Sequence, residues 1–263
     1  MKWLLGLLQS IGRPKVQIAA ALLQNAYFFP WMKRVPCTTL NCHACPAATF
    51  ACPVGIVQGF ETSRQVPFFV LGILGIVAIV IGRLSCGWFC PFGFLQDLMY
   101  RIRTPKLMVR YNLGWLRYIV LIGLVGIATF IAQDLWFCKL CPAGSLEAGI
   151  PMISTDPILR SQIGWFFWLK ISILAVFLGL MIIIKRPFCR FVCPLGAIYS
   201  PFNSHSVLQL KVNKSLCIDC GHCREVCPMD MDIKVNSSSG ECIRCLECAK
   251  ICPVSAIGYE ETM

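Results

Sequence analysis

The chain has 263 residues, of which 57% are hydrophobic and only 14% are charged, and its mean hydropathy is +0.67. Soluble domains carry about 25% charged residues, so this composition excludes an ordinary soluble enzyme and a disordered chain, and indicates a membrane protein. The formal net charge is +11, from 24 basic and 13 acidic side chains. The 18 cysteines do not fit a short, secreted disulfide scaffold. Abundant cysteine in a membrane protein instead indicates bound metal.

Four apolar stretches are long enough to cross a membrane as helices, which takes roughly 17–25 residues. Lys170 lies in the last of them, and a lysine near a helix end normally extends to the interface, although a place on a proton path is the alternative. We therefore predict an all-α membrane domain over residues 1–202, with four transmembrane helices in two pseudo-repeats. The predicted spans are residues 16–32, 66–82, 113–137 and 163–184.

Basic residues are distributed unevenly around these stretches. Twelve flank the side that holds the N-terminus, the 83–112 loop and the segment after residue 184, against six on the other side. Because such an excess marks the cytoplasmic side, we expect a multi-pass protein of the cytoplasmic (inner) membrane with both termini in the cytoplasm. Met1–Lys15 lacks a cleavage site of small residues and is interpreted as an uncleaved, interfacial start.

Residues 203–263 have a different character and form a second predicted domain. They contain six basic and eight acidic side chains and no spanning stretch. The positive charge of the chain therefore belongs to the membrane domain, where it reports orientation, and nucleic acid is not expected as a partner.

The second domain contains two cysteine runs of the form C-x2-C-x2-C-x3-C-P, at 217–228 and 242–253. This is the bacterial pattern for two [4Fe–4S] clusters, in which the fourth cysteine of each run binds the other cluster. Structural zinc is the alternative, which two tandem copies with both prolines disfavour. We therefore predict a small α+β ferredoxin domain with two [4Fe–4S] clusters. The predicted ligands are Cys217, Cys220, Cys223 and Cys252 for one cluster and Cys242, Cys245, Cys248 and Cys227 for the other.

Two further motifs of identical spacing follow the second and fourth apolar stretches, on the predicted cytoplasmic side. Both have the form C-x3-C-P-x-G, at 86–93 and 189–196. Four thiolates from two matched motifs can complete one cluster site, which we call the inner site. The alternative is a pair of turns whose thiols bind nothing. The predicted ligands are Cys86, Cys90, Cys189 and Cys193.

The remaining six cysteines fall on the predicted outer side. C-P-x-G occurs there as well, at Cys52 and Cys141, so the motif appears once after each apolar stretch and indicates an internal duplication. The symmetry predicts an outer cluster, with Cys138 and Cys141 as two ligands. Alternatively, the first four outer cysteines hold a cluster alone and Cys138 and Cys141 form a redox pair, or the thiols form plain disulfides. The other two ligands of the symmetric site would come from Cys37, Cys42, Cys45 and Cys52.

At these motifs the sequence resembles the NapH/MauN-type membrane polyferredoxins. The resemblance covers nearly the whole length and rests on residues 86–97 (CGWFCPFGFLQD), residues 189–198 (CRFVCPLGAI) and the two ferredoxin runs. It implies transmembrane electron transfer, often from membrane quinol toward an outer-side reductase system, in a complex with redox protein partners. The six outer cysteines depart from the nitrate-reductase member of that family, which leaves the substrate system open and suggests that electrons are handled at both membrane faces.

A quinol site needs an apolar slot beside a cluster and a proton acceptor. The candidates are Gln96 and Asp97 near the inner site, and His43 and Glu147 near the outer one. Each can instead cap a helix or lie solvated at the interface, and His43 is also a possible cluster ligand. Nothing in the sequence resembles a nucleotide-binding glycine loop or a hydrolytic triad.

These features predict a membrane-bound protein that passes electrons between the quinone pool and redox protein partners. It would be the electron-transfer subunit of an oxidoreductase such as a quinol dehydrogenase. The alternatives are a transmembrane thiol reductant that uses Cys138 and Cys141, and a redox-sensing or assembly protein. A bilayer core of about 30 Å is too thick for one hop between clusters at its two surfaces. A partner haem, a mobile quinone or sunken cluster loops must therefore fill the gap.

Overall fold

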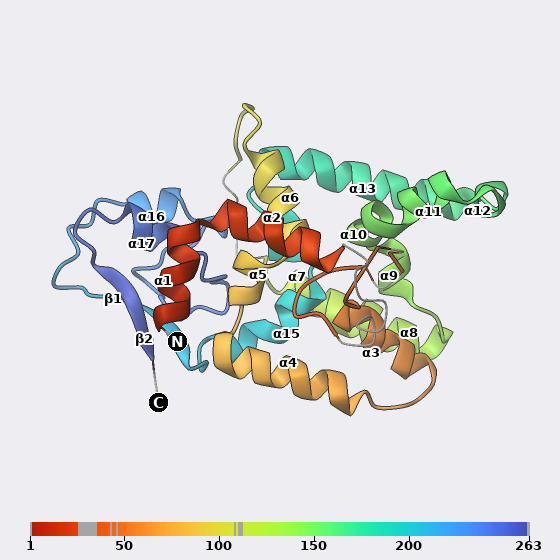
Figure 1. Ribbon diagram of the computed structural model, residues 1–263, viewed down its shortest axis with the longest axis horizontal. Coiled ribbons are helices and arrows are strands. Elements are labelled where there is room, and N and C mark those ends of the chain that lie inside the picture. Colours follow the sequence, from red (N-terminus) through yellow and green to blue (C-terminus); the bar gives the residue numbers. More distant parts are fainter. Residues whose placement is uncertain are drawn as a thin grey trace.

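The computed structural model describes residues 2–25, 36–42, 44–45, 47–107, 109 and 113–261. A largely helical body makes up most of the molecule, and a small domain with two strands lies at one end, beside both marked chain ends (Figure 1). The first half of the body contains α1 (Lys2–Ile11), α2 (Arg13–Gln24), α3 (Pro53–Thr62), α4 (Phe68–Ile81), α5 (Leu84–Trp88) and α6 (Pro91–Tyr100). The second half contains α7 (Leu116–Ile119), the π-helical η2 (Val120–Ile127), α8 (Ala128–Ala132), α9 (Trp136–Leu140), α10 (Pro142–Gly144), the π-helical η3 (Ser145–Gly149), α11 (Ile150–Thr155), α12 (Pro157–Ser161), α13 (Trp165–Ile183), α14 (Pro187–Phe191) and α15 (Pro194–Asn203).

The predicted set of four transmembrane helices is wrong. Within the described residues only α13, with 19 residues, is long and apolar enough to cross a membrane. The continuous helix Leu116–Ala132 and α4 are shorter. With 14 residues, α4 spans about 21 Å at 1.5 Å per residue, against a hydrocarbon core of about 30 Å.

Turns that a hydropathy pattern does not register end these helices early. Gly82 ends α4 with φ at 55°, in the left-handed region, and a Cβ there would overlap the amide oxygen of Asn203. Gln133 ends the Leu116–Ala132 helix, with φ at 51°. The first predicted span begins within α2, and its part beyond residue 25 lies outside the described residues.

The two segments that carry C-x3-C-P-x-G pack reciprocally. Each segment consists of a long helix, a short helix and a third helix that begins at the proline of a Cys-Pro step. The first segment is α4–α5–α6, and the second is α13–α14–α15. The long helix α13 packs against α6, and α4 packs against α15 (Figure 1). Each half therefore covers the helix that follows the cysteine motif of the other half.

The small domain is closed by a two-stranded antiparallel sheet. Strand β1 (Leu208–Val212) pairs with β2 (Ile257–Glu261) in a register that runs from Leu208 opposite Glu261 to Val212 opposite Ile257. The strands flank the two predicted ferredoxin runs, so their pairing brings the ends of the domain together. Two short helices, α16 (His222–Glu225) and α17 (Glu247–Ile251), lie between them in sequence.

The small domain contacts the helical body through α5, the short helix that overlaps the first C-x3-C motif. Trp88 is buried and donates its indole N–H to the carbonyl oxygen of Arg244 at 3.0 Å. A Cβ on Gly87 would overlap the carbonyl oxygen of Ile243. The absence of a side chain at Gly87 therefore permits this close approach.

We expect Gly87→Ala to destabilise the protein by about 1–3 kcal/mol, because a methyl group forced into a packed contact must displace its neighbours. Chemical unfolding of the cluster-loaded protein measures the change. Gly59→Ala is the matched control, since the added methyl group meets nothing within 4 Å and helical Gly→Ala changes stabilise by up to about 1 kcal/mol. Equal stability of the two variants would contradict the close contact.

Candidate metal centres

The four C-P-x-G motifs share one local structure, in which the cysteine immediately precedes a helix and proline occupies its first position. Proline is suited to this position because its missing N–H has no intrahelical partner there. The amide N–H of Gly93 points to Cys90 Sγ at 3.4 Å, and that of Gly196 points to Cys193 Sγ at 3.4 Å. The positive end of the helix favours a thiolate. The helical segments that begin in this way are α3, α6, α10 and α15, after Cys52, Cys90, Cys141 and Cys193.

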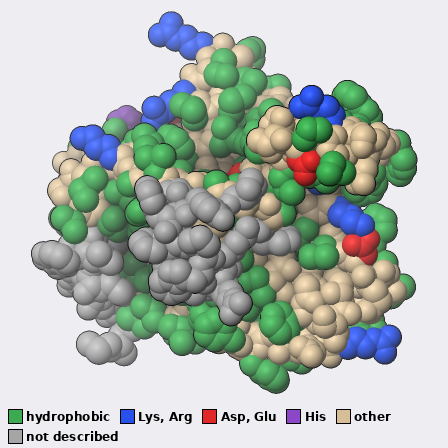
Figure 2. Space-filling view, turned by 45° about the vertical axis from the view of Figure 1, so that its right-hand side comes forward, with side chains coloured by type: hydrophobic (Ala, Val, Ile, Leu, Met, Phe, Trp, Pro, Cys, Tyr) green, Lys and Arg blue, Asp and Glu red, His purple; other side chains and the backbone are tan. Residues whose placement is uncertain are grey.

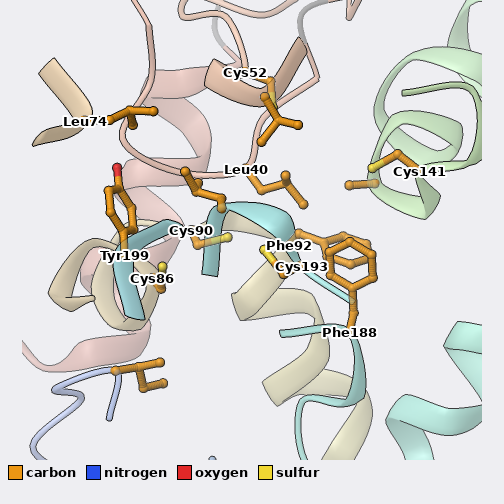
Figure 3. Close-up of a cluster of buried hydrophobic side chains, with 14 of the residues drawn as sticks. Leu40, Cys52, Leu74, Cys86, Cys90, Phe92, Cys141, Phe188, Cys193 and Tyr199 are labelled. Carbon is orange, nitrogen blue, oxygen red and sulfur yellow. The ribbon is translucent and has the colours of Figure 1, made fainter. Parts of the chain in front are cut away.

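The four inner cysteines converge in the interior between the two halves. The Cys193 thiol, buried next to the other three, has a pKa raised by desolvation and by the charges of Cys189, Cys86 and Cys90. The sulfur atoms of Cys90 and Cys193 point toward one another in the cluster of buried side chains (Figure 3). The structure therefore brings together the predicted inner set, with two cysteines from each half.

A second group comprises four of the six cysteines predicted for the outer side: Cys42, Cys52, Cys138 and Cys141. Burial raises the pKa of Cys141, and the neighbouring Cys52 and Cys42 raise it further. The pKa of Cys138 is raised in the same way by burial, Cys52, Cys141 and Cys42. A Cβ on Gly144, in the turn after Cys141, would lie 3.4 Å from Cys42 Sγ. These contacts bring cysteines of the two halves together.

The other two outer cysteines border this group but make other contacts. Cys37 Sγ lies 3.0 Å from Thr39 Oγ1 and 3.5 Å from Gln24 Oε1. Cys45 Sγ lies 3.9 Å from Asn25 Oδ1, and Cys45 packs in a small apolar cluster with Ala48 and Ala148. Both thiols are thus directed to polar groups near the end of α2.

The small domain contains two cavities, and each is lined by one predicted ligand set. The first is bordered by Cys217, Cys220, Cys223 and Cys252. The second is bordered by Cys227, Cys242, Cys245 and Cys248, with Cys223 also on its wall. The structure therefore brings the fourth cysteine of each run to the three cysteines of the other.

The donor chemistry of these sets fits clusters better than single ions. All 18 cysteines lie among the described residues, and none of them forms a disulfide. In the described part of the chain, no three Cys, His, Asp or Glu side chains converge closely enough to hold one metal ion. A cubane is bound differently, because each of its four thiolates binds a separate iron.

Cysteines of the inner and outer groups belong to one buried hydrophobic core. Cys52 and Cys141 of the outer group belong to the same buried cluster as Cys86, Cys90 and Cys193 (Figure 3). Tyr199 lies near cysteines of both groups. Its hydroxyl donates to the carbonyl oxygen of Thr38 at 3.1 Å, and its pKa is raised by burial and by cysteines of both groups.

Comparison with known proteins places the chain in a family. Residues 64–110, 113–150 and 165–214, just over half of the chain, match a family described as a 4Fe-4S binding domain. The chain belongs to this 4Fe-4S binding family. Residues 209–253 match a 4Fe-4S dicluster domain. Bound iron–sulfur clusters are therefore the cofactors of this ferredoxin-type protein.

Three relatives illustrate the family. The chain is 33% identical over 194 residues to the uncharacterized protein MJ0750 of Methanocaldococcus jannaschii. The alignment covers 69% of this chain and 74% of the relative. It is 27% identical to the methylamine utilization ferredoxin-type protein MauN of Methylobacillus flagellatus, over 59% of this chain and 52% of that protein. It is 26% identical to the ferredoxin-type protein NapH of Haemophilus influenzae, over 57% and 49% of the two chains.

These relatives confirm the resemblance to NapH/MauN-type proteins. The chain spans about half the length of the MauN and NapH relatives. No solved structure matches it.

Two of the residues predicted for a quinone site in this ferredoxin-type protein form hydrogen bonds and ion pairs with other residues of the protein. Gln96 is fully buried, and its amide donates to Cys189 Sγ at 3.0 Å. Asp97 forms hydrogen-bonded ion pairs with Arg186, at 2.5 and 2.7 Å, and with Arg13. Burial alone would raise the pKa of Asp97, but Arg186 and Arg13 hold it below its ordinary value. Both side chains thus support the inner site.

The other two candidates lie near the outer group in sequence. Glu147 accepts a hydrogen bond from the backbone N–H of Cys42 at 2.6 Å. Burial raises its pKa to about 7, against the lowering effect of that hydrogen bond. His43 lies outside the described residues.

Two buried arginines, Arg83 and Arg186, were missed at the sequence level. Each lies three residues before the first cysteine of its motif, so the repeated pattern extends to R-x2-C-x3-C-P-x-G. Comparing the two motifs from three residues further upstream would have found them.

We expect Asp97→Asn to destabilise the protein by about 3–5 kcal/mol at neutral pH, because it leaves the guanidinium of Arg186 buried without its charge partner. Asp97 stabilises the folded protein at neutral pH because its pKa is lower in the folded state than in the unfolded state. This contribution to the free energy of unfolding is complete above the ordinary aspartate pKa of about 3.9. It is lost only as the pH falls through the lower pKa of the folded state. Chemical unfolding at pH 7 measures the effect.

Asp134→Asn provides the control for this substitution. Asp134 pairs with Lys139 at a solvent-exposed position, where an ion pair contributes about 1 kcal/mol or less. A loss in Asp97→Asn no greater than that of the control would show that the Asp97 pairs do not support the fold.

Proposed function

We propose that this protein is a membrane-associated electron-transfer protein with four [4Fe–4S] clusters, which passes electrons between the quinone pool and redox protein partners in a multisubunit complex. The observation that carries the proposal is the convergence of sixteen cysteines into four sets of four. Such clusters carry single electrons over a wide range of potentials. The name of one relative, the putative electron transport protein YccM of Escherichia coli, is in keeping with this role.

The four proposed sites use all but two of the cysteines. In the outer site the thiols of Cys42 and Cys52 join Cys138 and Cys141, which favours a cluster over an isolated redox pair. Cys37 and Cys45 are left as bordering thiols. The other proposed ligands are Cys86, Cys90, Cys189 and Cys193 for the inner site, and the sets Cys217, Cys220, Cys223, Cys252 and Cys242, Cys245, Cys248, Cys227 for the ferredoxin domain.

The sites follow one another through the molecule, which supports a continuous path. Cys245 of the ferredoxin domain and its neighbour Ile243 belong to the same buried cluster as Cys86 and Cys90. That cluster also includes Cys52 and Cys141 of the outer site. In this arrangement, sunken cluster loops remove the need for a hop across the whole bilayer.

Exposed apolar side chains support the membrane association. Phe68 is 78% exposed on α4, Ile131 is 75% exposed on α8 and Trp165 is 74% exposed on α13. Figure 2 shows hydrophobic side chains scattered over one face, with Lys and Arg groups mostly toward its edge. Large exposed apolar surfaces of this kind are covered by lipid or by a partner. We propose the cytoplasmic membrane as the location, with α13 as the candidate span.

An apolar pocket between α3 and η2 is the proposed quinone site. Its wall contains Val57, Leu121 and Phe130, and Glu61 and Arg64 lie beside them. Burial raises the pKa of Glu61, which suits a carboxylate that accepts a proton from quinol. Helix α3 begins directly after Cys52, so about 13 Å of helix connects the pocket to the outer site.

Iron and acid-labile sulfide counts test the ligand sets. We expect about 16 irons per chain for the unmodified protein, and about 12 for Cys42→Ser and for Cys141→Ser. Cys37→Ser and Cys45→Ser are the matched controls and should keep all 16. About 8 irons in the unmodified protein would leave only the ferredoxin pair, and loss of iron from the two controls would overturn the choice of outer ligands.

Leu121→Trp tests the quinone pocket, because the larger side chain fills part of it. We expect the rate at which a short-chain quinol bleaches the visible cluster absorption to fall at least tenfold, a barrier increase of about 1.4 kcal/mol. Ile122→Trp, at an adjacent position that is exposed, should leave the rate unchanged. Equal rates for the two variants would exclude this pocket.

A further inference from the structure

The guanidinium groups of Arg83 and Arg186 lie in the interior beside the inner cysteines. Arg83 is fully buried and Arg186 is 1% exposed. A buried guanidinium is unfavourable unless charged or hydrogen-bonding groups surround it. What surrounds each of these two groups therefore indicates what the site is built to hold.

The two arginines reach across the pseudo-symmetric halves. Arg83 Nη2 lies 3.1 Å from the point where a Cβ on Gly196 would lie, and both terminal nitrogens of Arg186 lie 3.4 Å from the corresponding point on Gly93. These glycines are the ones whose amides point to Cys193 and Cys90. Each guanidinium thus lies in the cysteine turn of the opposite motif.

Arg83 has unmet hydrogen-bonding capacity at this position. Its Nη1 donates to the carbonyl oxygen of Gly240 at 2.8 Å, while its Nε and Nη2 are buried with no partner. Its nearest carboxylate, Glu241, is 3.6 Å away and already accepts two hydrogen bonds from Arg117, at 2.6 and 2.7 Å. Unpartnered buried donors are rare, and here they lie near the thiols of Cys86, Cys189 and Cys193.

Arg186 is placed differently but shares the same surroundings. Its Nη1 donates to the carbonyl oxygen of Cys86 at 3.1 Å, and its other nitrogens bind Asp97. Asp97 is shared with Arg13. Each of the two carboxylates near the inner site thus pairs with two guanidiniums. Part of the positive charge is therefore not neutralised by these carboxylates and can pair with a further anion.

Arg244, the buried arginine of the ferredoxin domain, provides a contrast. Its Nη1 donates to the carbonyl oxygen of Ile81, and its Nη2 donates to the carbonyl oxygen of Asn203 and to the Ser206 hydroxyl. Arg244 therefore connects parts of the fold, whereas Arg83 retains donors directed into a cysteine site.

We propose that Arg83 donates hydrogen bonds to the cluster at the inner site, and that Arg83 and Arg186 together raise the reduction potential of this cluster above those of the ferredoxin domain. This rests on the proposed function. One-electron reduction by an external donor adds one negative charge to a cluster and its four thiolates. Fixed positive charge and hydrogen bonds to sulfur stabilise that more negative state, which raises the potential. The inner site then collects electrons between the ferredoxin domain and the outer site.

Redox titration of the full-length, cluster-loaded protein by electron paramagnetic resonance tests this proposal. The inner signal is identified as the one lost in Cys193→Ser. In Arg83→Gln and Arg186→Gln we expect the ratio of reduced to oxidised inner cluster at a fixed potential to fall at least tenfold, which corresponds to about 59 mV for one electron. Arg83→Lys keeps the charge but loses the fork of donors, and should give a smaller fall.

Arg190→Gln is the matched control. Arg190 lies between Cys189 and Cys193 in sequence, but its side chain binds the carbonyl oxygen of Val109 and lies 3.7 Å from Asp230. It should leave the inner potential unchanged. Unchanged potentials in both Gln variants, or an equal shift in the control, would overturn the proposal.

The outcomes also separate this proposal from the proposed function. If Arg83→Gln loses four irons, the Arg83→Lys protein is measured in its place. A lowered potential of its inner cluster supports the proposal, and an unchanged potential overturns it. If both variants lose four irons with the ferredoxin signals intact, Arg186→Gln decides: a lowered inner potential supports the proposal, and an unchanged one overturns it. An unmodified protein with only 8 irons would instead show that the proposed inner cluster does not exist.

Discussion

A proline that follows a cysteine and begins a helix is the constraint on which the rest of this structure depends. Because proline lacks an N–H and has a fixed φ, it favours the first turn of a helix and disfavours continuation of the one before it. Four such steps place Cys52, Cys90, Cys141 and Cys193 at helix starts in the interior. Each step therefore places a thiol at the positive end of a new helix.

The glycine of each motif lets the two halves approach closely. In the inner pair, a side chain on Gly93 or Gly196 would displace the guanidinium of the opposite half. The arginine of each half thus lies in the cysteine turn of the other half, which joins the halves around four thiols. Asp97 and Glu241 pair with these arginines. The same close approach recurs at Gly87, where the ferredoxin domain meets the body. The molecule is thus assembled around its cysteine sites, and electron transfer is the function that such a core supports best.

Local spacing allowed much of the site to be predicted from the sequence. The ferredoxin runs and the C-P-x-G motifs are local patterns whose spacing carries the geometry of a cluster. Spacing could not select among the outer cysteines, because Cys37 is directed away by Gln24 and Thr39, contacts that depend on the tertiary fold. Hydropathy overestimated the helices, since the turns at Gly82 and Gln133 depend on backbone conformation. Gln96 and Asp97 were singled out for a quinone, but they bind a thiol and two arginines.

Magnetic coupling between the inner and outer clusters tests most directly whether they share one core. In the fully reduced full-length protein, we expect the electron paramagnetic resonance signal of the inner cluster to be broadened by the outer one and to sharpen in Cys141→Ser. An inner signal that is identical with and without the outer cluster, as expected for centres separated by a bilayer core of about 30 Å, would contradict the continuous path.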